Sequence, residues 1–357
     1  MKIAVLLSGG VDSSVALRLL QQQGHDLTAF YLKIWLQEEY SFLGNCPWEE
    51  DLEYAHAVCE QAGVPLQVIP LQDEYWDRVV SYTITEIKNG RTPNPDMFCN
   101  SLVKFGAFLD KIDSSFDKVA SGHYATVEEK QNRFYLKRSP DPVKDQTYFL
   151  AYLKQKQLAR ALFPIGTYEK KEVRQLAKDF DLPNKTRKDS QGICFLGKIK
   201  FKDFVREHLG TLPGDIVNLE TMAKVGTHPG YYYYTIGQRE GIGLHGGPWY
   251  VVRKDIVNNV IYISQKKDIL SAQRSEFDVI KLNWLNEIPT NGSSLHVKIR
   301  HGAHLFPCVI EQRSYDVFSV KLHGADKGIA AGQFAVFYDG EYCLGGGIIS
   351  DTIKENP

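Results

Sequence analysis

The feature that most constrains this 357-residue chain is a short apolar run near its start that stops at two glycines. Residues 3–7 are all apolar, as expected for a strand buried on both faces, and Ser8-Gly9-Gly10 interrupts them. Apolar residues at helical spacing follow, up to Gly24. A strand that turns through glycines directly into a helix is the opening of an α/β fold.

The same alternation continues over roughly the first 150 residues. Residues 27–32 and 66–69 are predicted strands, residues 52–62 and about 73–88 are predicted helices, and another strand is expected to end near residue 120. Strands separated by helices imply right-handed βαβ units. The sequence therefore predicts a parallel, doubly wound sheet whose ligand binds at the carboxyl ends of the strands.

The pattern becomes all-β after Leu212-Pro213-Gly214. Asn291-Gly292 and Asp339-Gly340 are expected in tight turns. Predicted strands occupy residues 231–235, 249–252, 260–264, 295–299, 308–310, 317–322 and 334–338. We therefore predict an α/β domain over 1–205, a small central β-rich domain over 206–272 and a C-terminal β-barrel over 273–357.

Composition excludes several classes of protein. Hydrophobic residues make up 43% and charged residues 24%, which is typical of a globular chain. The uncharged apolar runs are far shorter than the ~20 residues of a membrane helix, so no membrane span is expected. Six cysteines are too few for a disulfide scaffold, and none lies at zinc-ligand spacing. A cytoplasmic protein is therefore expected.

Charge is unevenly distributed, although the formal net charge is only -1. Residues 154–206 contain fourteen Lys and Arg against six Asp and Glu, a local net charge of +8. Such a run could be a solvated helical surface. It also favours a polyanionic partner.

The loop Ser8-Gly9-Gly10-Val11-Asp12-Ser13 has the composition of a phosphate-binding turn. Glycines allow backbone N–H groups to approach an anion, and the start of the following helix adds its positive end. No lysine follows the glycines, so the loop is not a Walker A motif. Binding ATP here would need magnesium, with Asp12 as a candidate ligand, directly or through water. A tight strand-to-helix turn with a Ser or Asp cap is the alternative.

This loop resembles the pyrophosphate-binding loop of the adenine-nucleotide α-hydrolase-like ATP pyrophosphatases. The resemblance implies cleavage of ATP to AMP and pyrophosphate by adenylation of a substrate oxygen. The loop alone does not select the substrate, because the superfamily also includes GMP synthetase and argininosuccinate synthetase.

Two of the cysteines have unusual surroundings. Cys99 follows Pro93-Asn94-Pro95, where two prolines rule out a regular helix up to about Pro95. Cys194 lies in the basic segment, where positive neighbours favour a thiolate. For each, a buried structural thiol is the alternative, and Cys59 and Cys308 are expected to be core residues.

Five motifs in order make the resemblance closer. They are Pro93-Asn94-Pro95-Asp96-x-x-Cys99-Asn100, Ser121-Gly122-His123-Tyr124, Lys144-Asp145-Gln146-Thr147-Tyr148-Phe149-Leu150, Lys188-Asp189-Ser190-x-Gly192-Ile193-Cys194-Phe195 and Gly345-Gly346-Gly347-Ile348-Ile349. Together they resemble the tRNA-specific 2-thiouridylase family over nearly the whole chain. In that family the C2 oxygen of the wobble uridine of certain tRNAs is replaced by sulfur.

The resemblance implies roles for three residues. Adenylation turns the C2 oxygen into a leaving group, Cys194 carries the sulfur as a persulfide, and Cys99 is the nucleophile that completes transfer. Asp96 is the candidate general acid or base, with an Asx turn as its alternative. Two routes stay open: the persulfide attacks C2 directly, or Cys99 first releases hydrosulfide. Either leaves a Cys99–Cys194 disulfide that an outside reductant must reset.

The resemblance also assigns binding positions. ATP is expected at Leu6, Leu7, Ser8, Gly9, Gly10, Val11, Asp12 and Ser13, with Leu32 near the adenine and Gly122 at the nucleotide. The flipped target base is expected at Asn94, Pro95 and Asp96, and the rest of the tRNA at His123, Lys144, Asp145, Gln146, Arg300, His301 and Gln333. His123 could instead be a satisfied strand-end histidine, and Gln333 a turn residue.

The implied partners are tRNA of the Glu, Gln and Lys type and a sulfur donor, either a cysteine desulfurase or a relay protein. The chain is expected to act as a monomer. Two other functions remain open at this stage: a small-molecule ATP pyrophosphatase ligase such as an amide synthetase, and a tRNA-binding protein without turnover.

Overall fold

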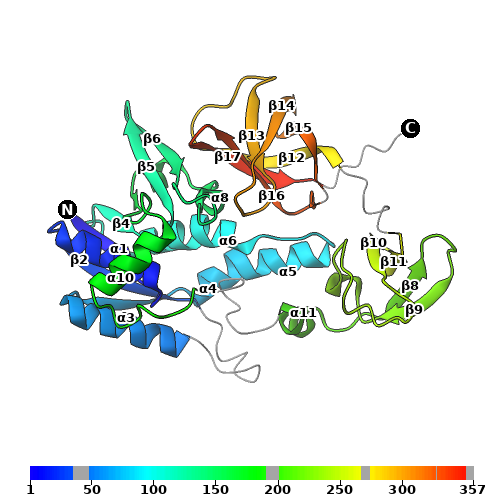
Figure 1. Ribbon diagram of the computed structural model, residues 1–357, viewed down its shortest axis with the longest axis horizontal. Helices are drawn as coiled ribbons and strands as arrows, with labels where there is room; N and C mark the ends of the chain where they lie inside the picture. Colours follow the sequence, from blue (N-terminus) through cyan, green and yellow to red (C-terminus); the bar gives the residue numbers. More distant parts are fainter. Residues whose placement is uncertain (35–47, 190–200, 267–273, 327, 351–357) are drawn as a thin grey trace.

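The computed structural model describes residues 1–34, 48–189, 201–266, 274–326 and 328–350. Its strands form a five-stranded parallel sheet, a four-stranded sheet and an eight-stranded sheet that contains a barrel (Figure 1). The parallel sheet with its helices and the C-terminal barrel confirm the predicted fold class.

The parallel sheet has the strand order β3-β2-β1-β4-β7. Its strands are β1 (Lys2–Leu6), β2 (Asp26–Lys33), β3 (Leu66–Pro70), β4 (Lys118–Ala120) and β7 (Ala161–Leu162). The order reverses between β1 and β4, because the chain moves outward through β2 and β3 and then returns to the other side of β1. The loops after β1 and β4 therefore diverge and leave room for a ligand between them.

Both faces of β1 are buried, as the uniformly apolar run predicts. Ile3 and Val5 pack in the cluster that contains the apolar side chains of α1 (Val11–Gln22), α3 (Trp48–Ala62) and α10 (Lys170–Asp179). Ala4 and Leu6 face the opposite cluster. That cluster includes α4 (Gln72–Tyr75), α5 (Ser81–Lys88), α6 (Pro95–Phe98) and α7 (Phe108–Lys111), with the π-helical turns Trp76–Val80 and Cys99–Ala107 between them.

Six antiparallel strands close the C-terminal barrel: β12 (Arg274–Trp284), β13 (Ser294–Lys298), β14 (Phe306–Ser314), β15 (Val317–Asp326), β16 (Phe334–Asp339) and β17 (Tyr342–Ile349). Pairing of β17 with both β16 and β12 completes the circuit. Here Gly345, Gly346 and Gly347 leave no room for a side chain. An added Cβ would lie 2.0 Å from the Asn283 oxygen at Gly345 and 2.6 Å from the Ala335 oxygen at Gly346. The triple-glycine motif thus allows the barrel to close.

A hairpin from the N-terminal half extends the barrel sheet, and sequence patterning did not predict it. Strands β5 (Ala125–Lys130) and β6 (Arg133–Arg138) turn through Gln131 and Asn132, both at positive φ. β6 then pairs with β17 at Leu136 and Lys137. Figure 1 shows the hairpin rising from the parallel sheet beside the barrel.

A buried ion pair fastens the barrel to the N-terminal half. Lys298 Nζ, at the end of β13, lies 2.7 Å from Asp145 Oδ2, and both side chains have no exposed surface. Arg138 and Thr147 also donate to the Asp145 carboxylate, at 3.0 and 2.7 Å. Burial alone would raise the pKa of Asp145, but Lys298 and these donors lower it overall, so the carboxylate stays ionised. A second tie is the bond from the Tyr148 hydroxyl to the Phe334 carbonyl, 3.1 Å.

The central sheet has the order β10-β11-β8-β9, from β8 (Gly214–Asn218), β9 (Lys224–His228), β10 (Tyr250–Asp255) and β11 (Val260–Ser264). The predicted strand over 231–235 is wrong, because Tyr231–Tyr233 form a 3-10 turn. The Tyr232 and Tyr233 hydroxyls donate to carbonyls at the end of α11 (Phe201–Leu209), and Tyr231 donates to the Lys88 carbonyl. Successive side chains that all bond to helix ends cannot alternate as they do in a strand.

The structure adds one observation on membrane association. Within the described ranges, no helix is long and apolar enough to cross a bilayer.

We predict that Lys298→Met lowers the free energy of unfolding by about 3–5 kcal/mol, because it leaves the Asp145 carboxylate buried beside fewer cations. Thermal and urea denaturation would measure the loss. Lys321→Ala is the matched control, since Lys321 lies in the same barrel in an exposed ion pair with Glu276 and should cost less than about 1 kcal/mol. Equal losses for the two variants would contradict a structural role for the buried pair.

Candidate active site

The loop after β1 has the geometry of an anion cradle. Gly9 adopts φ +73°, and a Cβ there would lie 2.1 Å from the Asp51 carbonyl oxygen. Gly10 caps α1, so the first N–H groups of a twelve-residue helix point toward the loop without helical partners. The Ser13 hydroxyl accepts the Ser8 N–H at 3.2 Å and donates to the Gly10 carbonyl at 3.1 Å. These bonds hold the turn in shape.

The loop after β4 closes against this cradle. A Cβ on Gly122 would lie 2.6 Å from the Ser13 nitrogen and 2.7 Å from the Asp12 carbonyl carbon. The two loops on either side of the strand reversal therefore approach through a position that only glycine fills. Among the other positions expected at ATP, Leu6, Leu7 and Val11 have buried side chains, so they offer only backbone groups, and Leu32 lies near the end of β2, beside β1.

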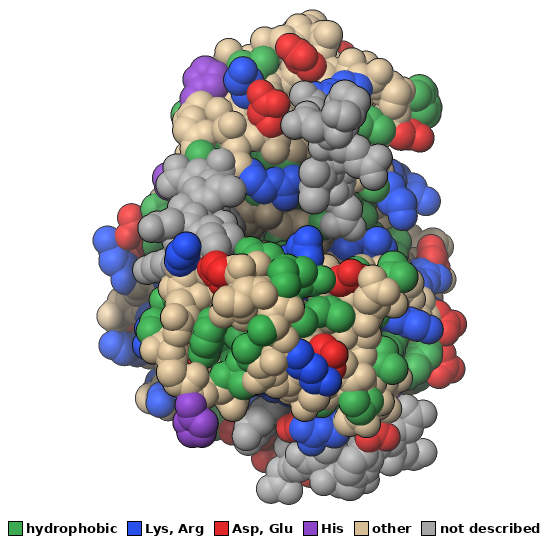
Figure 2. All heavy atoms as spheres, turned by 90° about the vertical axis from the view of Figure 1, so that its right-hand side faces the viewer, with side chains coloured by type: hydrophobic (Ala, Val, Ile, Leu, Met, Phe, Trp, Pro, Cys, Tyr) green, Lys and Arg blue, Asp and Glu red, His purple; other side chains and the backbone are tan. Residues whose placement is uncertain are grey.

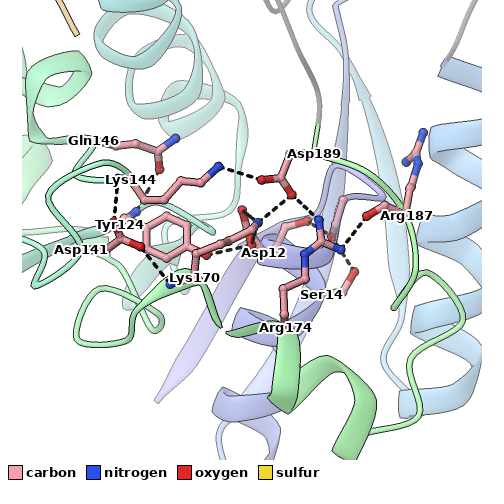
Figure 3. Close-up of polar contacts among 12 residues, drawn as sticks. Asp12, Ser14, Tyr124, Asp141, Lys144, Gln146, Lys170, Arg174, Arg187 and Asp189 are labelled. Atoms are coloured by element: carbon pink, nitrogen blue, oxygen red, sulfur yellow. Dashed lines mark hydrogen bonds and ion pairs between the residues drawn. The ribbon is translucent and has the colours of Figure 1, made fainter. Parts of the chain in front are cut away.

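Charged side chains from four parts of the chain gather around Asp12 and Asp189 (Figure 3). Lys170 Nζ lies 2.7 and 2.9 Å from the two Asp12 carboxylate oxygens and 2.8 Å from Asp189 Oδ1. The Tyr124 hydroxyl donates to Asp12 at 3.0 Å, and Lys144 Nζ lies 2.7 Å from Asp189 Oδ2. We call Asp12, Lys144, Lys170, Arg174 and Asp189 the charge cluster.

Asp189 is the junction of the charge cluster. Its carboxylate is held by Lys144, Lys170 and Arg174. Burial would raise the pKa of Asp189, but hydrogen bonds from Lys144 and Lys170 outweigh it and hold the pKa well below its ordinary value. Sequence reasoning predicted Asp12 and Lys144 but missed Lys170, Arg174 and Asp189 as site residues. The available signals were the net charge of +8 over residues 154–206 for the two cations and the Lys188-Asp189-Ser190 motif for Asp189.

The remaining contacts fix the backbone of the cradle. Asn184 Nδ2 donates to the Gly9 carbonyl at 2.8 Å and to Ser14 Oγ at 2.9 Å, while Arg187 bonds to Gly9 and to the Asp51 carboxylate. Gln146 accepts the Tyr124 N–H at 2.9 Å and so ties the loop after β4 to the 144–150 motif. The cradle is thus supported from several sides.

The segment with Cys99 begins at Pro95, as the prolines predict. Pro95–Phe98 is one helical turn, and Cys99 starts the π-helical turn that follows, with a residue exposure of 1%. Asn100 Nδ2 donates to the Asp96 carbonyl at 3.0 Å and to the Phe149 carbonyl at 3.3 Å. This bond joins the Asn94–Asp96 motif to the 144–150 motif. Cys194 lies outside the described residues.

Gln333 contacts the chain just before the Asn94–Asp96 motif. Its amide donates to the Thr92 carbonyl at 2.9 Å and to the Pro93 carbonyl at 3.3 Å, and the Thr92 N–H donates to the Ala331 carbonyl. The residues that lead into β16 of the barrel therefore fix the position of this segment.

Two expected tRNA contacts are buried. Asp145 is 1% exposed in its ion pairs, and His123 is 8% exposed with Nδ1 2.7 Å from the Ser121 hydroxyl. Burial holds the pKa of His123 well below its ordinary value, so its ring is neutral.

The other expected tRNA contacts in the barrel have partners within the protein. Arg300 is half-exposed in a bidentate pair with Asp326, and the His301 ring stacks on Phe149 with centroids 4.7 Å apart.

Comparison with known proteins decides the family. The tRNA methyl transferase HUP domain model matches residues 1–198, the tRNA methyl transferase PRC-barrel domain model matches 202–265, and the aminomethyltransferase beta-barrel domain model matches 274–349. The tRNA-specific 2-thiouridylase MnmA of Parabacteroides distasonis is 44% identical over 99% of this chain and 100% of that protein. The chain belongs to the tRNA-specific 2-thiouridylase family.

Two further relatives support this assignment at nearly the same coverage. MnmA 1 of Bacteroides thetaiotaomicron is 45% identical and MnmA 2 of Bacteroides fragilis is 46% identical, each over 98% of this chain and 100% of the relative. The family expected from the five motifs is thus confirmed. The domain models name a methyl transferase, whereas these full-length members of the family are named thiouridylases.

We predict that Gly122→Ala weakens ATP binding at least about tenfold, because the methyl group pushes the loop after β4 out of the cradle. Isothermal titration of ATP into the whole protein measures this. Gly24→Ala is the matched control: it also strains a glycine, at φ +75°, but in open space at the far end of α1. Its ATP affinity should stay at the wild-type value. Unchanged affinity in Gly122→Ala would contradict a nucleotide site between the two loops.

Proposed function

We propose that this protein replaces the C2 oxygen of the wobble uridine of tRNA with sulfur, and that it consumes ATP and releases AMP and pyrophosphate. The single observation that carries this proposal is the chain's membership of a thiouridylase family over its full length, combined with a cradle built by two glycine loops. The reaction needs ATP because oxide is a poor leaving group from the C2 carbon, and adenylation makes it leave as AMP.

The cradle fits the phosphates of ATP. Gly9 in the cradle and Gly122 in the loop against it take positions where a Cβ would collide with backbone, and the start of α1 offers N–H donors to an anion. For magnesium, no group of three or more His, Cys, Asp or Glu side chains with metal-binding geometry occurs among the described residues. A magnesium ion held mainly by phosphates and water with one carboxylate suits this arrangement, and Asp12 would be that carboxylate. The ion would neutralise charge on the leaving pyrophosphate.

Sulfur transfer is assigned to Cys99 and Cys194, with Asp96 as proton donor or acceptor. Cys99 and Asp96 lie one helical turn apart, and the Asn100 amide fastens that turn to Phe149. Sulfur reaches the base either directly from a persulfide on Cys194 or as hydrosulfide that Cys99 displaces from that persulfide. Each route ends in a Cys99–Cys194 disulfide, so an external thiol must reduce the enzyme between turnovers.

For tRNA recognition we propose two kinds of role. Asn94, Pro95 and Asp96 contact the flipped base, while Lys144, Gln146, Arg300 and His301 contact the rest of the tRNA. For Asp145, His123 and Gln333 the proposed role is positional, because the Asp145 carboxylate, His123 Nδ1 and the Gln333 amide nitrogen already bond within the protein. Figure 2 shows Lys and Arg side chains in the recess between the barrel and the central sheet, which suits a polyanion.

We also propose that the protein acts as a monomer in the cytoplasm. A cysteine desulfurase or a relay protein would supply its sulfur.

The test is nucleoside mass spectrometry of unmodified glutamate tRNA after incubation with protein, magnesium and a desulfurase, with and without ATP. ATP-dependent 2-thiouridine is expected, and Cys99→Ala and Cys194→Ala should both reduce it to background. If Cys194→Ala retained activity with the desulfurase, Cys194 would not carry the persulfide. No thiolation with any donor, despite ATP binding, would favour a ligase or a tRNA-binding protein.

Cys59→Ala is the matched control for these variants. Cys59 is buried in α3, where burial raises the pKa of its thiol to about 11. It should thiolate tRNA near the wild-type rate. A loss as large as that of Cys99→Ala would show that removal of any buried cysteine is enough to inactivate the protein.

A further inference from the structure

The Lys170 ammonium lies at the rim of the cradle, where a cation would neutralise a bound anion. Its ammonium touches both oxygens of Asp12, the second residue of α1, and one oxygen of Asp189. The side chain is 15% exposed. Its three N–H donors are thus satisfied by carboxylates at the rim of the phosphate loop.

The backbone of Lys170 is fixed while its side chain has alternatives. Its N–H donates to Asp141 Oδ2 at 3.1 Å, and it opens α10 behind a capping box made by Glu169 and Glu172. The four-carbon side chain can therefore change partners without movement of the helix. Figure 3 shows it extending from α10 toward Asp12.

Asp189 does not depend on Lys170 alone. When the Lys170 ammonium leaves, Lys144 and Arg174 still hold the Asp189 carboxylate. Asp12 differs from Asp189 in this respect, because among the described residues the partner it keeps is the Tyr124 hydroxyl. A magnesium ion that arrives with the phosphates would supply the charge that Asp12 loses.

We propose that Lys170 binds the phosphates of ATP, and that it exchanges its bonds to Asp12 and Asp189 for bonds to phosphate oxygens when the nucleotide enters. Asp12 would then be free to bind a magnesium ion. The same exchange runs backward when pyrophosphate departs, which restores the resting ion pair. This inference rests on the proposed use of ATP and adds a phosphate-binding residue outside the glycine loop.

Simple loss of Lys170 has two effects that must be separated. Lys170→Met removes a hydrogen-bond donor to the phosphates, but it also leaves Asp12 as an unneutralised negative charge beside the phosphates. The Asp12→Asn/Lys170→Met double variant removes one charge of each sign. Titration in EDTA keeps magnesium out, so that Asp12 acts only as a repelling charge.

The experiment is calorimetric titration of ATP into the full chain, in EDTA and in magnesium, with activity not required. In EDTA we expect Asp12→Asn to bind ATP more tightly than wild type, and Lys170→Met about tenfold more weakly or worse. The double variant should remain about tenfold weaker than Asp12→Asn. In magnesium, Asp12→Asn should lose most of the gain in affinity that the ion gives the wild type. If the double variant matched Asp12→Asn, Lys170 would only neutralise Asp12 and the inference would be overturned.

Two controls keep the outcome interpretable. Lys171→Met changes the next residue of α10, whose exposed side chain pairs with Glu169, and should leave ATP affinity unchanged. Lys170→Arg keeps the charge and should retain part of the ATP affinity. It serves as the test variant in case Lys170→Met folds poorly. Absence of ATP binding by the wild type would defeat the proposed function. Wild-type binding with equal affinities for Lys170→Met and Lys171→Met would defeat only this inference.

Discussion

The reversal of strand order between β1 and β4 is the constraint on which the rest of the structure depends. It separates the two loops that follow these strands and directs both toward one crevice. At that crevice Gly122 contacts the backbone of Ser13, so the loops form one wall with no side chain between them. The charged residues of α10 and of the segment after it then reach the same crevice from outside the sheet.

The barrel supports the base-binding motif from a distance in sequence. Gln333 and Ala331 bond to the chain at Thr92 and Pro93, and the Phe334 carbonyl accepts from Tyr148. The Lys298–Asp145 pair fixes the start of the 144–150 motif in the interior, where neither side chain has exposed surface and the ion pair is strong. The C-terminal strands thus supply part of the framework of the catalytic segment.

Much of this arrangement could be predicted from sequence, and the failures have physical causes. The apolar run 3–7 and the glycine loop predict the sheet and cradle, because both depend on local pattern. The pairing of β6 with β17 joins residues about two hundred positions apart, and no local signal records it. Lys170 was missed because a lysine on a charged helix has the same sequence pattern whether it faces solvent or Asp12. The burial of Asp145 against Lys298 also has no local signal, because the two residues lie 153 positions apart in the sequence.

The pairing of β6 with the final strand also bears on how the molecule is made. Until Tyr342–Ile349 has been synthesised, the barrel cannot close and β6 keeps one edge without the partner it has in the finished protein. An exposed strand edge readily joins other strands, including those of neighbouring nascent chains. The catalytic half therefore reaches its finished form only when β17 has been made. A ribosome that stops short of β17 releases a protein with an open sheet edge and an incomplete support for its base-binding motif.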